Sequence, residues 1–180
     1  RAVSKILSQI NYEFEFIDLG GGMGIKYSNN NKKLNYKKYN LAIKKFLKNK
    51  KCKIIFEPGR SIIGNTGTLI TKVIYIKDSE SKKFIILDAA MNDLMRPALY
   101  GATHKTLPII RAGKVSKKTY EFVGPICEST DKFVTMKNFQ ELQEKDYIAI
   151  CDVGAYGMSL SSNYNLRTKP LELLIKNNKI

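Results

Sequence analysis

The sequence predicts an α/β part followed by a mostly β part. Up to residue 66, short apolar segments alternate with stretches of helical spacing, which is typical of α/β folds. Beyond Gly67, apolar segments follow one another with no long helical stretch between them, which indicates a β-rich fold. With 43% hydrophobic and 26% charged residues, the 180-residue chain can bury a core without a disulfide or a metal. We therefore expect two domains, residues 1–66 and 67–180, with the boundary in residues 64–67.

Two strands and a helix are predicted in the first part. Residues 14–19 (FEFIDL) form an apolar segment that leads directly into a glycine-rich turn, GGGMG. Residues 36–50 have helical spacing, with one apolar face made of Tyr36, Tyr39, Ile43, Phe46 and Leu47. Residues 53–56 (KIIF) form the second apolar segment, which ends at the proline and glycine of EPGR. Residues 1–10 have helical spacing without the features of a secretion signal, and we expect them to lie inside a longer chain.

Four further strands are predicted in the second part. They are apolar segments of strand length, and turn-forming residues lie between them. They cover residues 68–77, 83–87, 120–123 and 147–151. Because no long helix separates them, we expect a sandwich or a barrel of strands.

The net charge of the chain is strongly positive. It is +15, from 31 lysines and arginines against 16 acidic residues, and such an excess ordinarily indicates a polyanionic partner. Only five of the 31 basic residues are arginine, however, and lysine, asparagine and isoleucine are abundant together, as in chains encoded by AT-rich genomes. No RNA-binding or DNA-recognition motif accompanies the charge. We therefore expect no nucleic-acid partner.

Membrane and metal-binding classes are excluded by similar arguments. No apolar run reaches the ~18–20 residues of a membrane span, so we expect no membrane partner. Cys52, Cys127 and Cys151 lack CxxC spacing, and His104 is the one histidine of the chain. Neither a disulfide framework nor a zinc site is expected from this set, and we expect no metal.

The two turns that follow the strands of the first part carry groups suited to ligand binding. Gly20, Gly21 and Gly22 leave backbone N–H groups open to an anion such as phosphate, because no Cβ stands in the way. The run matches neither GxGxxG nor the P-loop, and by itself a tight turn is the simpler explanation. In EPGR, Glu57 and Arg60 bring a carboxylate and a guanidinium to the carboxyl end of a strand. A surface ion pair at a turn is the alternative for this motif.

Three turns in the second part also carry reactive or charged side chains. In RPALY, the turn aims Arg96 as a carboxylate clamp with Tyr100 beside it. GPICESTD contains Cys127 and Glu128, and DVGAYG flanks Tyr156 with glycines. Each motif alone is compatible with turn chemistry. Five such turns at strand ends within one chain are harder to explain as loops.

Taken together, the five segments resemble one enzyme family. In chain order they are IDLGGGMGIKY, EPGRSIIGNTG, LDAAMNDLMRPALYGATH, GPICESTD and CDVGAYGMSLSSNYN, and they span most of residues 14–165. This combination resembles the carboxyl-terminal portion of the diaminopimelate decarboxylases, a family of pyridoxal-phosphate enzymes with the alanine-racemase-like fold. The resemblance implies that residues 1–66 are the last units of a (β/α)8 barrel. It implies that residues 67–180 are a carboxyl-terminal β-rich domain that completes the site.

The resemblance implies a role for each candidate cofactor residue. The glycines of the first turn would cradle the phosphate of pyridoxal 5'-phosphate, and Tyr156 would add a hydroxyl. Glu57 would face the pyridine nitrogen and keep it protonated, so that the ring accepts electrons. The cofactor-binding residues expected in this way are Gly20, Gly21, Gly22, Glu57, Gly59, Arg60 and Tyr156.

Substrate-binding and catalytic roles follow from the same resemblance. Arg60, Arg96 and Tyr100 would hold the carboxylate at the distal end of the substrate, with Tyr156 nearby. Glu128 would pair with the ammonium group of that end, and the two charges would match a zwitterion. Cys127 is the expected acid near the reacting carbon. In the family, the segment that corresponds to Cys127 and Glu128 reaches into the neighbouring subunit's site, so we expect a homodimer with shared active sites.

The resemblance also implies what this chain lacks. The family's Schiff-base lysine and the histidine that stacks on the cofactor lie in earlier barrel strands, and neither motif occurs in this sequence. His104 follows RPALY and does not correspond to that histidine. We therefore expect an incomplete chain that is inactive alone. The complete enzyme would convert meso-2,6-diaminopimelate to L-lysine and carbon dioxide, the last step of lysine biosynthesis, in the cytoplasm or in a eukaryotic plastid.

Two alternatives remain beside this hypothesis. Ornithine and arginine decarboxylases share the fold, the glycine turn and EPGR. Glu128 in place of an aspartate, and the pair of Arg96 with Tyr100, favour a substrate with a distal carboxylate. The second alternative is a non-catalytic binding or regulatory protein on the same fold. Retention of all the candidate residues argues against that class.

Overall fold

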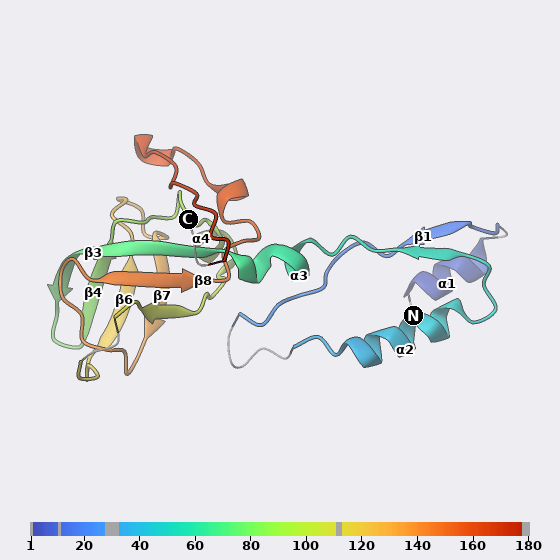
Figure 1. Cartoon of the computed structure of the whole chain (residues 1–180), viewed down its shortest axis with the longest axis horizontal. Coiled ribbons are helices and arrows are strands. Elements are labelled where there is room, and N and C mark those ends of the chain that lie inside the picture. Colours follow the sequence, from blue (N-terminus) through green and yellow to red (C-terminus); the bar gives the residue numbers. More distant parts are fainter. Residues whose placement is uncertain (1, 11, 28–32, 111–112, 178–180) are drawn as a thin grey trace. The chain divides into compact units, whose positions relative to one another are not determined.

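A computed structural model describes residues 2–10, 12–27, 33–110 and 113–177 of the chain (Figure 1). The chain divides into two compact units, Arg1–Ile62 and Ile63–Ile180. This division lies a few residues before the boundary that we expected after residue 66. Each unit is described by itself below.

The first unit contains two short parallel strands and three helices. Its elements are α1 (Ala2–Gln9), β1 (Phe16–Asp18), α2 (Tyr36–Leu47), β2 (Lys53–Ile55) and the start of α3 (Gly59–Ile63). β1 and β2 pair in register, with Ile17 opposite Ile54. The predicted strands and helix are therefore present, but each is shorter than expected. Helix α2 ends before residue 50 because Lys48 takes up an extended ψ of 125° and Asn49 a positive φ of 65°.

The parallel pairing decides where the two turns of this unit lie. Parallel strands have their carboxyl ends at the same edge of a sheet, so the residues after Asp18 and after Ile55 are neighbours. A backbone hydrogen bond of 3.1 Å from Leu19 N–H to the Ile55 carbonyl continues the pairing. The glycine turn and the EPGR turn therefore leave this edge together. Two strands alone do not establish the (β/α)8 barrel.

The second unit is built on one six-stranded sheet with the order β5-β8-β3-β4-β6-β7. The strands are β3 (Thr68–Asp78), β4 (Lys82–Leu87), β5 (Thr106–Pro108), β6 (Thr119–Val123), β7 (Lys132–Met136) and β8 (Tyr147–Cys151). All neighbours are antiparallel except β4 and β6. The expectation of a mostly β second part is confirmed. Because the described strands share one sheet, they do not form a two-sheet sandwich.

The long strand β3 connects the two halves of this sheet. Its first half pairs with β8, from Thr68 opposite Cys151 to Lys72 opposite Tyr147. Its second half pairs with β4, and the register shifts between Val73 and Tyr75. Such an irregularity bends a strand and increases its twist. The sheet can therefore curl around the core at this point.

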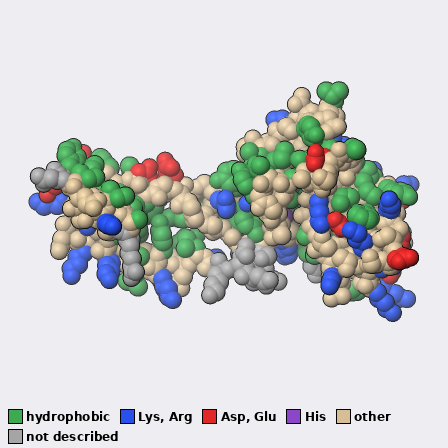
Figure 2. All heavy atoms as spheres, turned by 180° about the vertical axis from the view of Figure 1, so that it is seen from behind, with side chains coloured by type: hydrophobic (Ala, Val, Ile, Leu, Met, Phe, Trp, Pro, Cys, Tyr) green, Lys and Arg blue, Asp and Glu red, His purple; other side chains and the backbone are tan. Residues whose placement is uncertain are grey.

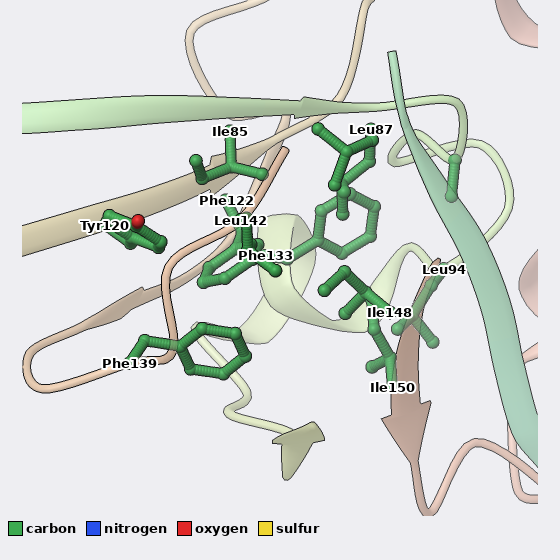
Figure 3. Close-up of a cluster of buried hydrophobic side chains, with 12 residues drawn as sticks. Ile85, Leu87, Leu94, Tyr120, Phe122, Phe133, Phe139, Leu142, Ile148 and Ile150 are labelled. Atoms are coloured by element: carbon green, nitrogen blue, oxygen red, sulfur yellow. The ribbon is translucent and has the colours of Figure 1, made fainter. Parts of the chain in front are cut away.

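A cluster of apolar side chains fills the concave side of the sheet (Figure 3). Its members come from five of the six strands and from the connections: Val73, Ile85, Leu87, Ala89, Leu94, Tyr120, Phe122, Phe133, Phe139, Leu142, Ile148 and Ile150. The rings of Tyr120, Phe122 and Phe139 pack against one another, with centroids 5.1 to 6.2 Å apart. Alternate residues of β6 and β8 are buried, as expected for strands with one solvent face.

The surface shows no concentration of positive charge on the face seen in Figure 2, where the Lys and Arg side chains are scattered. Some of the described lysines of the second unit are paired with acidic residues. Lys82 Nζ and Lys132 Nζ each lie 2.8 Å from the Glu121 carboxylate. Among the described residues, no helix combines the length and the apolar character that a membrane span requires.

Close backbone contacts fix the turn after β8. A Cβ on Gly154 would overlap the carbonyl oxygen of Ile63 and crowd the N–H of Gly67. Val153 and Gly154 donate backbone hydrogen bonds of 3.1 Å to the carbonyls of Gly67 and Gly64. The segment that carries Tyr156 is therefore held against the start of β3.

Gly154→Ala should destabilise the second unit, because the new methyl group has no space beside Ile63. We expect a loss of about 1–3 kcal/mol in the free energy of unfolding, measured by urea denaturation. Gly24→Ala is the control, since nothing lies within 4 Å of a Cβ at Gly24. An unfolding curve for Gly154→Ala that coincides with that of the parent would contradict this account of the turn.

Candidate functional site

The glycine turn of the first unit is tied to the EPGR turn by backbone contacts. Glu57 N–H donates to the Gly20 carbonyl at 2.9 Å, and Gly20 N–H donates to Asp18 Oδ1 at 2.7 Å. A Cβ on Gly21 would lie 2.5 Å from the Glu57 carbonyl oxygen. The absence of a side chain at Gly21 is therefore required by packing, which sequence analysis could not separate from ligand binding. The structure brings the glycines and Glu57 together.

The remaining groups of this turn fit a bound anion. Gly20 and Gly22 have φ values of +65° and +79°, and nothing lies within 4 Å of a Cβ at either position. The Gly20 N–H is already bonded to Asp18, whereas among the described residues the N–H groups of Gly21 and Gly22 donate to no protein acceptor. Two N–H groups beside an open backbone can bind phosphate oxygens. Gly21 and Gly22 are thus better placed than Gly20 to donate.

The other expected residues of this unit have different surroundings. Gly59 N–H donates to the Glu57 carbonyl at 2.9 Å, so that this amide serves the turn itself. Glu57 is exposed, and Arg60 lies half-buried on the short helix α3. The Glu57 side chain is therefore accessible to a ligand, whereas Gly59 shapes the turn that presents it.

In the second unit, Arg96 and Tyr100 lie at the two ends of the helix α4 (Arg96–Tyr100), which replaces the expected turn. Their exposure differs greatly: Arg96 is 5% exposed and Tyr100 is 67% exposed. Nη1 of Arg96 lies 3.0 Å from Nε2 of His104. The helix ends at Gly101, whose φ of 61° lets its N–H bond to the carbonyls of Pro97 and Arg96. This cap turns the chain back, so that His104 meets Arg96.

Asp131 holds the turn that contains Cys127 and Glu128. This carboxylate is 3% exposed and accepts hydrogen bonds from Met91 N–H at 2.7 Å and Ile126 N–H at 2.9 Å. Burial raises the pKa of Asp131, and the two backbone donors oppose the increase. A Cβ on Gly124 would overlap the same carboxyl group. Asp131 thus joins the turn after β6 to the segment that precedes α4.

Glu128 and Cys127 are exposed at the tip of this turn. Glu128 Oε1 accepts hydrogen bonds of 3.3 Å from Thr130 N–H, Thr130 Oγ1 and Ser129 Oγ. These bonds, led by the one from Thr130 N–H, lower the pKa of Glu128 below its ordinary value. The ionised carboxylate is suited to an ammonium group. Ser129 and Thr130 also line a groove of about 480 Å³ opposite Pro97 and Ala98 of α4.

A second buried acid lies in the segment before α4. Asp93 is 7% exposed, and its Oδ2 accepts a 2.8 Å hydrogen bond from Ala90 N–H. Burial raises the pKa of Asp93, and Arg167 opposes this with Nη2 at 3.7 Å from Oδ2. Arg167 also donates to Asn92 Oδ1 at 3.1 Å and to the Asp88 carbonyl. Arg167 therefore ties the chain after β8 to this segment.

Tyr156 lies after β8 with an unusual backbone conformation. Its φ is +67°, which is rare for a bulky side chain, and its side chain is 43% exposed. A Cβ on Gly157 would overlap the Val153 carbonyl, so the next position requires glycine. The positive φ of Tyr156 carries a conformational cost of the kind that is common at functional sites.

Sequence analysis missed four residues that organise these turns: Asp93, Asp131, Arg167 and His104. Asp131 stood in the GPICESTD motif as one of two carboxylates, and nothing in the sequence indicated that it would be buried. The contacts of Arg167 span more than 70 residues along the chain, from Arg167 to Asp88, Asn92 and Asp93. No local pattern could reveal them. Among the described residues, no cluster of His, Cys, Asp and Glu is arranged to hold a metal ion.

These features define the class of the protein. The chain combines a curled sheet domain with a preceding parallel strand pair that carries a glycine turn and an exposed glutamate. Residues 10–154 match the family model described as "Pyridoxal-dependent decarboxylase, C-terminal sheet domain". The chain belongs to this family, whose cofactor is pyridoxal phosphate.

The relatives that match nearly the whole chain include diaminopimelate decarboxylases. The diaminopimelate decarboxylase of Aquifex aeolicus is 42% identical over 99% of this chain, which corresponds to 44% of that protein. The solved diaminopimelate decarboxylase of Helicobacter pylori, complexed with L-lysine, superimposes with a TM-score of 0.81 at 42% identity, covering 98% of this chain and 43% of that one. A lysine/ornithine decarboxylase of Vibrio vulnificus, complexed with cadaverine, shares the fold at a TM-score of 0.77 and 18% identity, over 92% of this chain and 45% of its own. The chain therefore spans less than half the length of the relatives that it matches.

Asp131→Asn should destabilise the second unit although it preserves the side-chain shape. Both carboxylate oxygens accept from backbone N–H groups, and an amide offers one oxygen and one NH₂. One buried N–H then loses its acceptor, which we expect to cost about 1–3 kcal/mol in the free energy of unfolding.

Denaturation of the variant by urea measures this loss. Glu144→Gln, at an exposed position, is the matched control and should leave the midpoint unchanged. Equal midpoints for the parent and for Asp131→Asn would show that the carboxylate does not hold the turn.

Proposed function

We propose that the protein carrying this chain is a pyridoxal-phosphate-dependent decarboxylase that converts meso-2,6-diaminopimelate to L-lysine and carbon dioxide. The observation that carries the proposal is the contact between the glycine turn and Glu57 at one edge of the parallel strand pair. This contact places N–H groups that can bind phosphate close to the residue that carries the Glu57 carboxylate. The relatives named above, which match nearly the whole chain, support the same reaction.

In this proposal, most of the residues that bind the cofactor belong to the first unit. The N–H groups of Gly21 and Gly22 bind its phosphate, and the Tyr156 hydroxyl adds a further donor. The Glu57 carboxylate would face the pyridine nitrogen and keep a proton on that atom. When bound, pyridoxal phosphate accepts the electron pair that remains when carbon dioxide leaves. Glu57 is therefore the group through which this chain controls the electron demand of the cofactor.

In the same proposal, the second unit supplies most of the residues that bind the end of the substrate that does not react. Arg96, with Arg60 and Tyr100, binds the distal carboxylate, and the ionised Glu128 binds the distal ammonium group. The hydrogen bonds from Ser129 and Thr130 orient the Glu128 carboxylate and lower its pKa. Cys127, exposed next to Glu128, delivers the proton to the reacting carbon. A substrate whose distal end carries only an ammonium group can pair with Glu128 but not with Arg96.

The arrangement of subunits is part of the proposal. Cys127 and Glu128 are at the tip of an exposed turn, and we place them in the active site of a second copy, so that the enzyme is a homodimer with shared sites. We also propose that the 180 residues alone have no activity, for a separate reason. The lysine that binds the cofactor covalently lies in the part of the protein that this chain does not contain.

Glu57→Ala in the complete enzyme should lower turnover far more than substrate affinity. Without the carboxylate, the pyridine nitrogen loses its proton and the transition state loses electrostatic stabilisation. We expect kcat to fall about 100-fold, the size of effect seen when one such group is removed, with KM little changed. Steady-state kinetics with saturating cofactor measures both. Normal turnover with a lower melting temperature would instead make Glu57 a residue that stabilises the turn.

The distal charges should control substrate choice. Glu128→Gln should sharply lower kcat/KM for diaminopimelate, because the substrate ammonium group then lacks its charged partner. Arg96→Ala should narrow the preference for diaminopimelate over L-lysine as substrate, since lysine that binds as a substrate has its one carboxylate at the reacting centre and none at the distal end. Competition assays with the two substrates give the ratio directly. An unchanged ratio in both variants would favour a decarboxylase of the ornithine or arginine type.

A further inference from the structure

The imidazole of His104 lies between two segments of the proposed site and contacts both. Nε2 lies 3.0 Å from Nη1 of Arg96 on α4, and Nδ1 lies 3.0 Å from the carbonyl oxygen of Cys151 at the end of β8. His104 is 5% exposed. The backbone around it is also fixed, because Cys151 N–H donates to the Lys105 carbonyl at 2.8 Å and Thr106 pairs with Ile150.

The partners of the ring decide its tautomer. A carbonyl oxygen only accepts hydrogen bonds, so Nδ1 carries the proton. A guanidinium only donates, so Nε2 is the acceptor and bears no proton. His104 is therefore neutral. Burial lowers the pKa of His104, and the charge of Arg96 lowers it further, while the Cys151 carbonyl and the nearby Asp152 oppose the decrease.

The hydrogen bond between His104 and Arg96 influences how the guanidinium is oriented. The five N–H donors of an arginine lie in one plane, so a hydrogen bond at Nη1 restricts the directions that the other donors can take. Binding of a carboxylate by two parallel N–H groups depends on this direction. The helix cap at Gly101 and the hydrogen bond to the Cys151 carbonyl position the His104 ring. The ring in turn positions Arg96.

We propose that His104 is a positioning residue that, as the neutral Nδ1–H tautomer, holds the Arg96 guanidinium in the orientation that receives the distal carboxylate of the substrate. The inference rests on the proposed function, in which Arg96 binds that carboxylate. The same contact links α4 to the turn that carries Tyr156, since Cys151 directly precedes that turn. One buried ring thus aligns two parts of the site.

Two substitutions in the complete enzyme separate the two nitrogens of the ring. The amide of glutamine reaches the position of Nε2 and can accept from Arg96, whereas the amide of asparagine reaches only the position of Nδ1. We expect His104→Asn to raise KM for diaminopimelate about tenfold, with a smaller change in kcat, because a hydrogen bond to a charged group is lost. His104→Gln should restore KM to within about threefold of the parent. The inhibition constant of L-lysine, whose carboxylate is the distal one of the substrate, should follow KM.

Controls distinguish failure of this inference from failure of the proposed function. Thr106→Val removes the hydrogen bond from Thr106 Oγ1 to the His104 carbonyl and should leave KM unchanged. If Arg96→Ala raises KM but His104→Asn does not, His104 has no positioning role. If Arg96→Ala leaves KM unchanged, the proposed role of Arg96 is wrong.

The tautomer offers a test that needs no active variant. In ¹⁵N spectra of the complete enzyme at neutral pH, the His104 ring is identified by the loss of its signals in His104→Gln. We expect a protonated Nδ1 and an unprotonated Nε2. A proton on Nε2 would contradict the inference, because such a ring cannot accept from Arg96.

Discussion

The buried carboxylate of Asp131 is the contact on which the arrangement of the second unit depends. It binds backbone N–H groups of two segments that are far apart in the sequence, Met91 before α4 and Ile126 after β6. The segment before α4 leads to Arg96, and the turn after β6 carries Cys127 and Glu128. A charged group is costly to bury, and its two charge-assisted hydrogen bonds offset that cost. The same atoms therefore set the positions of the proposed substrate-binding residues on both segments.

Backbone groups hold the other turns in a similar way. Gly21 packs against the Glu57 carbonyl, and Gly154 packs against Ile63, so that in each case a missing side chain allows two backbone segments to meet. His104 adds a side-chain link between Arg96 and the Cys151 carbonyl. The side chains proposed to meet ligands, such as Glu57, Glu128 and Tyr156, are exposed and lie on turns held by these contacts. Rigid turns at strand ends are suited to presenting such groups.

Local patterns in the sequence predicted most of the fold. Apolar segments of strand length located six of the eight described strands, all except β5 and β7. Strand β8 lies within the expected bounds because turn residues delimit it on both sides. The family and its cofactor followed from the combination of five motifs, and the match over residues 10–154 confirms the family. The choice between a sandwich and a single curled sheet could not be predicted, because it depends on how β3 divides its pairing between β8 and β4. The burial of Arg96, Asp131 and His104 was not predictable either, since it arises from contacts between distant segments.

We propose that this chain positions a guanidinium and a carboxylate to bind opposite charges at one end of a diaminopimelate molecule. A crystal structure of the complete enzyme with L-lysine bound tests it most directly, because lysine retains the distal carboxylate and ammonium group of the substrate. The account predicts that the lysine carboxylate contacts Arg96, with His104 Nε2 still bonded to Nη1, and that Glu128 of a second copy contacts the adjacent ammonium group. A lysine carboxylate bound elsewhere, with Arg96 bonded only within the protein, would contradict it.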